Sequence, residues 1–191
     1  LLNTLSKTRK PMQLNHYTSK FTKQRFPITL ISDNVSHAAN LGSLFRTADA
    51  FGVAHLILGG PVVELGRKFT KTSRATEQSV SFEQLETLSE KIHELKAQSY
   101  TLIALEITDK SIPVSELKLE KNSKIAFVIG DENHGVSDSV LEKCDAVVHI
   151  EMYGQNSSMN VVQATSIALY EFTKKLSINN IVKKNKTVLE N

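Results

Sequence analysis

The chain has 191 residues, of which 40% are hydrophobic and 23% are charged, and its formal net charge is +3. This length suits one domain with attachments, and no apolar run approaches the roughly 18–20 residues that span a bilayer. The single cysteine, Cys144, excludes an internal disulfide framework and a zinc site built from cysteines. No signal-peptide segment follows Leu1, so we expect a cytoplasmic protein without membrane or metal partners.

Charge is distributed unevenly along the chain. Residues 1–26 carry six cationic side chains and no acid, and residues 172–191 carry five lysines and one glutamate, which leaves −7 for residues 27–171. Basic ends around an acidic body suit a polyanionic partner, whereas solvated, disordered ends are the simpler alternative. We therefore expect a basic N-terminal arm (1–26), a central domain (27–176) and a basic C-terminal tail (177–191).

Strand-like and helix-like segments alternate in the first half of the chain. The predicted elements are, in order, a strand at 28–32, a helix at 37–51, a strand at 54–58 and a short basic helix within 66–77. Ser36 is a candidate N-cap of the first helix, and Gly52 fits the position just after its end.

The second half continues this alternation. Its predicted elements are a brief strand at 78–82, a helix at 83–98, a strand at 100–105, a mostly irregular stretch at 106–123, a strand at 124–129, a helix at 137–143, a strand at 146–150 and a helix at 160–176. The inward face of the last helix would carry Val161, Ala164, Ile167, Ala168 and Phe172. The pattern predicts an α/β fold, a mainly parallel sheet with helices on both faces.

Three polar clusters stand at junctions between predicted strands and helices. They are Asn40-Leu41-Gly42 with Arg46, then Gly130-Asp131-Glu132-Asn133-His134-Gly135, and then Ser157-Ser158-Met159-Asn160. Ligands of parallel sheets bind at the carboxyl ends of strands, where these groups could hold an anionic substrate and a cofactor. The motifs of dinucleotide-binding sites, P-loops, α/β-hydrolases and zinc proteases are lacking.

Each cluster also has a simpler interpretation. Arg46 would be a surface residue of an ordinary helix, the glycine-flanked loop a polar turn, and Ser157 or Ser158 a helix cap. Glycine at both ends of the loop argues against a plain turn, since turns seldom need it. We expect His134 to take no part in catalysis and Cys144 to be a packed thiol.

In order and spacing, the clusters resemble motifs of the SpoU/TrmH branch of the SPOUT RNA methyltransferases. The matching segments are residues 40–52, 127–137 and 150–171, and the resemblance covers roughly residues 27–176. It implies a deep trefoil knot in the C-terminal part, a rare exception to normal chain connections. It also implies bound S-adenosylmethionine, a homodimer with sites near the interface, and 2′-O-methylation of RNA, with tRNA favoured over rRNA.

The resemblance implies specific site residues. The catalytic set would be Asn40, Arg46, Glu132, Ser158 and Asn160. The cofactor pocket would use Leu105, Glu106, Gly130, Ile150, Ser158 and Met159. Two positions depart from the family: Glu151 replaces the usual proline, which alters loop rigidity and places a charge near the pocket, and Met159 replaces leucine. Some ribosomal members carry an N-terminal RNA-recognition domain, whose work we expect the basic arms to do here.

The implied reaction is in-line attack of a ribose 2′-oxygen on the cofactor's methyl carbon, which positioning at about 3–3.5 Å promotes. We expect Glu132 to make orienting hydrogen bonds, because a carboxylate against the sulfur would stabilise the ground state more than the transition state. Since a guanidinium keeps its proton in nearly every protein, we assign Arg46 to clamping the adjacent phosphate. The alternatives are a base atom as acceptor, a catalytically silent RNA-binding module, and a nucleotide-binding enzyme unrelated to RNA.

Overall fold

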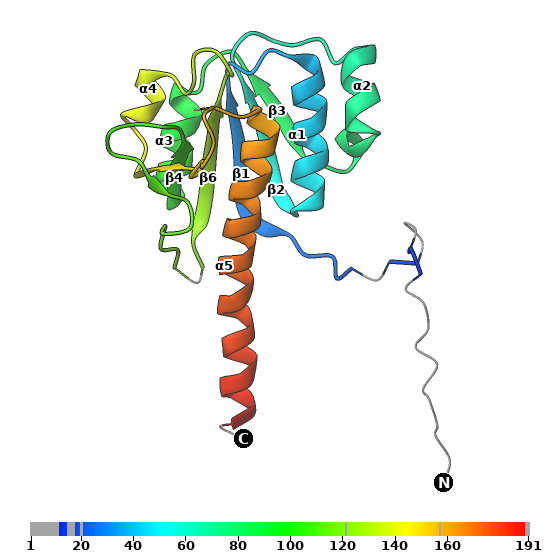
Figure 1. Ribbon diagram of the computed structural model, residues 1–191, viewed down its shortest axis with the longest axis vertical. Helices are drawn as coiled ribbons and strands as arrows, with labels where there is room; N and C mark the ends of the chain where they lie inside the picture. The colour runs from blue at the N-terminus through cyan, green and yellow to red at the C-terminus, as the bar shows by residue number, and fades with distance from the viewer. Residues whose placement is uncertain (1–11, 15–17, 20, 121, 157, 190–191) are drawn as a thin grey trace.

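The strands form one sheet in which every pairing is parallel, as predicted (Figure 1). The computed structural model describes residues 12–14, 18–19, 21–120, 122–156 and 158–189, with side chains up to residue 177. Within them the strand order is β3-β2-β1-β6-β4-β7-β5. The strands are β1 (Phe26–Asp33), β2 (Val53–Gly59), β3 (Phe82–Leu85), β4 (Tyr100–Leu105), β5 (Ile112–Pro113), β6 (Lys124–Gly130) and β7 (Ala146–His149).

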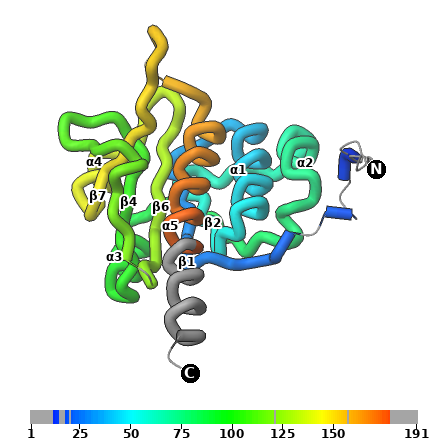
Figure 2. The backbone as a smooth tube through the Cα atoms, turned by 60° about the horizontal axis from the view of Figure 1, so that its bottom comes forward, coloured from blue at the N-terminus to red at the C-terminus, as the bar shows by residue number. Residues whose placement is uncertain are grey.

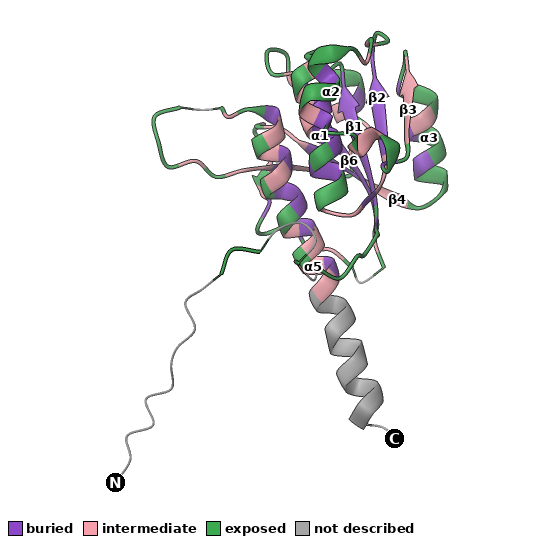
Figure 3. Cartoon of the chain, turned by 90° about the vertical axis from the view of Figure 1, so that its right-hand side faces the viewer, coloured by how far each residue is buried: buried purple, intermediate pink, exposed green. Residues whose placement is uncertain are grey.

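Helices cover both faces of this sheet, which confirms the predicted α/β architecture. They are α1 (Ala38–Ala50), α2 (Arg67–Ser73), α3 (Ser89–Ala97), α4 (Asp138–Leu141) and α5 (Val161–Leu189), with a short 3-10 helix η1 (Thr76–Gln78) after α2. Figure 3 shows the sheet between α3 on one side and α1, α2 and α5 on the other. Figure 2 shows α2, α1 and α5 side by side. None of the helices in the described residues is long and apolar enough to cross a membrane.

The core has two layers because successive residues of a strand point to opposite faces of the sheet. Leu30 of β1 and Phe127 of β6 belong to the cluster that also contains Phe172 of α5. Their neighbours Ile31 and Val128 belong to the other cluster, under α3 and α4. The rings of Phe127 and Phe172 meet edge to face at 4.9 Å, which holds α5 against β6.

Two predicted boundaries near α3 are wrong. The helix predicted from residue 83 begins at Ser89, because residues 82–85 pair with β2 as strand β3. The strand predicted at 78–82 therefore lies too early. The predicted cap of α1 is also wrong, since His37 precedes the helix and makes no side-chain capping bond.

The last helix differs from its prediction in its cap, its buried face and its end. Asn160, not Ser158, caps it, and Ser157 lies outside the described residues. Ile167 is 41% exposed, whereas Leu169 is fully buried. Val161, Ala168 and Phe172 are buried as predicted, and the prediction is wrong in placing Ile167, and not Leu169, on the buried face. The helix continues past the predicted end at residue 176 to Leu189.

Candidate functional site

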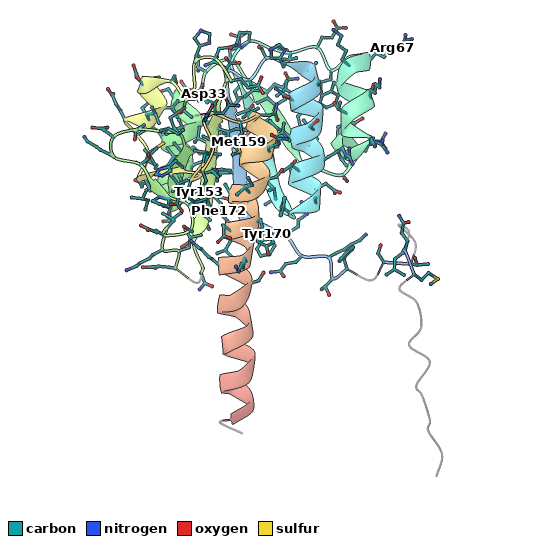
Figure 4. All side chains as sticks on the ribbon, in the orientation of Figure 1. Asp33, Arg67, Tyr153, Met159, Tyr170 and Phe172 are labelled. Atoms are coloured by element: carbon teal, nitrogen blue, oxygen red, sulfur yellow. The ribbon has the colours of Figure 1, made fainter. Side chains whose placement is uncertain are left out.

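A cavity of about 500 Å³ opens at the carboxyl ends of β4, β6 and β7, beside the start of α5. This size is typical of small-molecule sites. All six predicted cofactor residues line the cavity: Leu105, Glu106, Gly130, Ile150, Ser158 and Met159. Figure 4 shows Met159 at the start of α5, at the edge of the sheet where Asp33 ends β1.

The loop after β6 forms one wall of the cavity and is tightly folded. The Gly135 amide donates to the Asp131 carbonyl at 2.8 Å. Gly135 has φ +68°, and a Cβ at Gly130 would collide with the Gly135 backbone, so the loop requires glycine at both ends. The Asp131 carboxylate accepts the Asn133 amide at 3.0 Å and lies 3.2 Å from the His134 ring. These contacts, led by the Asn133 amide, lower the pKa of Asp131.

Two carboxylates hold the end of this loop from opposite sides. Glu106, after β4, accepts the Val136 amide at 3.0 Å and the Ile107 amide at 2.9 Å. Asp33, the last residue of β1, accepts the Ser137 amide at 2.8 Å and its hydroxyl at 2.6 Å. Because β1 and β4 flank β6 in the sheet, consecutive amides of the loop are fixed by both neighbouring strands.

Three of the predicted catalytic residues meet through one amide group. The Asn160 side chain donates to a Glu132 carboxylate oxygen at 2.6 Å and to the Asn40 side-chain oxygen at 3.3 Å. Its own oxygen accepts the Val162 amide at 3.0 Å and so caps α5. The start of α1, the loop after β6 and the start of α5 thus converge, and Glu132 and Ser158 line the cavity beside them. Glu132 makes an orienting hydrogen bond, as expected.

The structure does not join Arg46 to this cluster within one chain. Arg46 lies exposed on α1, six residues after Asn40. No hydrogen bond or ion pair among the described residues reaches its guanidinium group. Its predicted role therefore depends on a substrate or a second copy of the chain, and it stays a prediction.

The cavity is electrostatically negative. Its lining includes the carboxylates of Glu106, Asp131, Glu132 and Asp138, and among the described residues it includes no lysine or arginine. Glu151 is exposed and does not line the cavity, although its neighbours Ile150 and Met152 do. Such a lining favours a ligand with positive charge. The described residues contain no group of three or more His, Cys, Asp or Glu side chains that could hold a metal ion.

Sequence reasoning missed two polar residues at the strand ends. Asp33 was not selected, although it anchors the loop through Ser137. His149 ends β7 and lines the cavity, with its ring 3.0 Å from the Ser111 hydroxyl. Asp33 directly follows the strand predicted at 28–32, and His149 is the next-to-last residue of the strand predicted at 146–150, so their position at strand ends was the available signal.

Two further predictions concern residues away from the cavity. Cys144 donates to the Val140 carbonyl at 3.3 Å, and burial, followed by the charge of Asp145, raises its pKa to about 12, as expected for a packed thiol. Lys175, counted among the basic C-terminal residues, donates to the carbonyls of residues 114, 115 and 117 at 2.8–2.9 Å. It holds a loop and is not free for RNA. Most other cations of the two arms lie outside the described side chains.

Comparisons with known proteins agree with the geometry. The sequence model of the SpoU rRNA Methylase family matches residues 27–170. A Bordetella pertussis 23S rRNA (guanosine-2′-O-)-methyltransferase is 30% identical over 146 residues, 75% of this chain and 58% of its own length. The chain spans about three fifths of the length of the bacterial curated relatives that it matches.

Solved structures show the same fold. The A. aeolicus TrmH/SpoU tRNA modifying enzyme is 26% identical, with a TM-score of 0.74 over 83% of this chain and 79% of that one. An AdoMet-bound rRNA methyltransferase from Sinorhizobium meliloti is 21% identical, with a TM-score of 0.73 over 82% of this chain and 59% of that one.

Proposed function

Since the chain belongs to the SpoU rRNA Methylase family, we propose that it transfers a methyl group from S-adenosylmethionine to a ribose 2′-hydroxyl of RNA. One observation carries this proposal. The cavity lined by every predicted cofactor residue lies directly beside the bonded cluster of Asn40, Glu132 and Asn160. Cofactor pocket and reactive polar groups are thus adjacent, as methyl transfer requires.

The cavity fits the proposed cofactor. Its volume of about 500 Å³ accommodates a nucleoside with an amino-acid tail. Apolar side chains such as Leu105, Ile150 and Met159 offer surface to an adenine ring, and the ends of strands offer backbone hydrogen bonds. S-adenosylmethionine supplies a methyl carbon on a positively charged sulfur, and the carboxylates of the lining complement that charge. The S. meliloti structure with the same fold is described as AdoMet-bound.

The residues of this chain would position the acceptor. In-line attack by the 2′-oxygen requires that the ribose be held within about 3–3.5 Å of the methyl carbon. The free amide hydrogens of Asn40 and the hydroxyl of Ser158 are candidates for binding that ribose. Glu132, already bonded to Asn160, keeps these groups in place. Arg46 would clamp the neighbouring phosphate, for which its rigid fork of donors is suited.

We propose a homodimer as the working form. Ile167 and Tyr170 of α5 are 41% and 57% exposed, and we propose this apolar pair, three residues apart on one side of the helix, as part of the contact surface. They lie on the helix that packs beside α1 through Ser166 and Thr47, whose hydroxyls are 3.4 Å apart. We also propose that the Arg46 of the second copy completes the site. We also propose a trefoil knot in the C-terminal part, where the loop after β6 and the segment between β7 and α5 both line the cavity.

The class of RNA that serves as substrate is inferred from the names of the relatives. The A. aeolicus structure is described as a tRNA modifying enzyme, and the B. pertussis protein acts on 23S rRNA by name. We propose tRNA as the first substrate to test. A base atom as acceptor and a silent RNA-binding module are the alternatives that the same assay separates.

The test is methyl transfer from labelled S-adenosylmethionine to total RNA, followed by digestion and mass spectrometry. We expect the label on a ribose, at a site that has become resistant to alkaline cleavage. Label on a base would mean that a base atom, and not the ribose 2′-hydroxyl, is the acceptor. Cofactor binding without any labelled RNA would contradict the proposed activity. A heat-inactivated sample is the control.

A further inference from the structure

Helix α2 concentrates positive charge on an otherwise acidic body. Residues 67–74 carry Arg67, Lys68, Lys71 and Arg74 and no acid. Since residues 27–171 sum to −7, this short segment contributes +4 and the remainder −11. A phosphate backbone that approaches the body elsewhere would meet mostly like charge.

The four cations of α2 are exposed and take part in no ion pair among the described residues. Three other cations of the body do have partners. Lys91 lies 2.8 Å from Glu94, and Lys96 lies 2.9 Å from Asp145. Lys124 lies over the Tyr100 ring at 5.5 Å. The α2 side chains therefore lack the acidic partners that neutralise lysines elsewhere on the surface.

The helix is fixed in place, so these cations have a defined arrangement. Phe69 of α2 is 1% exposed, and its ring meets the Phe45 ring of α1 edge to face at 5.1 Å. A Cβ at Gly42 would collide with Thr72 and the Phe69 carbonyl, so α1 and α2 are packed backbone against backbone. Arg46, which is also exposed, lies one turn after Gly42 on α1.

The cationic side of α2 also lies at the edge of the sheet that carries the cavity. Figure 4 shows Arg67 at the beginning of α2, on the same edge as Asp33 and Met159. Helix α1 begins at this edge, and its first turn contains Asn40, whose side chain is bonded to Asn160. A strand of RNA whose ribose enters the site can therefore continue over α1 to α2.

We propose that Arg67, Lys68, Lys71 and Arg74, the α2 cationic face, bind the phosphate backbone of the RNA that the site methylates. This inference rests on the proposed function. From Arg67 to Ser73 helix α2 rises about 9 Å, which matches about three phosphates of one strand, and Arg74 follows directly at its end. Such contacts would position the RNA without reading its sequence.

The test compares two double variants with the unchanged chain. Lys68→Ala with Lys71→Ala removes two charges from the α2 cationic face, and alanine preserves the helix. Lys110→Ala with Lys118→Ala is the matched control, because these exposed lysines lie on the loop between β4 and β6, away from α2 (Figure 1). The readouts are the Kd for total RNA at several salt concentrations, cofactor affinity by calorimetry, and Tm.

The α2 variant is expected to lose about tenfold or more in RNA affinity, and the slope of log Kd against log salt should fall by about 2. Cofactor affinity and Tm should match the unchanged chain, and the control should bind RNA normally. Equal RNA binding by all three proteins would overturn the inference while the proposed function stands. Displacement of RNA by polyglutamate as effectively as by competing RNA would assign the face to acidic proteins and also overturn it. An unchanged chain that binds the cofactor but no RNA would overturn the proposed function as well.

Discussion

Replacement of Glu106 by glutamine tests whether the loop after β6 must be held for the cofactor to bind. The carboxylate accepts two backbone amides, at 3.0 Å from Val136 and 2.9 Å from Ile107. Glutamine keeps one acceptor oxygen and turns a donor toward the other amide. Val136 is 4% exposed, so an amide left without a partner there costs about 1–3 kcal/mol. If this cost disfavours the loop conformation that forms the cavity wall, the affinity for the cofactor drops about 5- to 150-fold.

Calorimetric titration with S-adenosylmethionine, well below the Tm of the variant, measures this effect. Glu116→Gln is the matched control, because Glu116 is exposed and lies outside the cavity lining. A Glu106→Gln protein with a lowered Tm but a cofactor Kd within about twofold of the unchanged chain would show that cofactor binding does not depend on this carboxylate. Glu106 would then support the fold without positioning the loop.

Three further changes have defined outcomes. Arg46→Ala should abolish methylation while cofactor affinity changes little, and a large loss in the calorimetric Kd would reject its assignment to the RNA. Because folding lowers the pKa of Asp131 below its ordinary 3.8, its carboxylate stabilises the fold above that pH and loses this effect as pH falls through the folded pKa. The loss of Tm caused by Asp131→Asn should therefore be full at neutral pH and shrink as the pH falls below 3.8, and a loss that stays constant over this range would contradict this. Ala75→Gly should raise Tm by about 2–4 °C, because Ala75 has φ +66°, whereas helical Ala39→Gly should lower it.

Local patterns in the sequence predicted the fold and part of the site. Runs of apolar residues located five of the strands in the described residues, β1, β2, β4, β6 and β7, and the paired glycines of the loop after β6 were recognised from their spacing alone. Gly130 and Gly135 are needed because a side chain at either would meet backbone or Glu106. The residues that line the cavity were predicted from the resemblance to the family, because local patterns do not relate segments that are distant in the sequence.

Interactions that depend on sheet order were beyond this reasoning. Asp33 and Glu106 hold the same loop only because β1 and β4 lie on the two sides of β6, an order that no local pattern reveals. Ile167 was wrongly assigned to the buried face of α5 for a related reason. Ile167 and Leu169 are both apolar, and the packing against β6 and α1 decides which of them is buried.

The most direct test of the central claim is an amide NMR titration of the chain with S-adenosylmethionine. The account predicts saturable shifts at the cavity, including Gly130, Gly135, Ile150 and Met159, and unchanged amides in α2. Shifts confined to the groove lined by Phe21, Phe51 and Tyr170, or none at a saturating concentration, would contradict it.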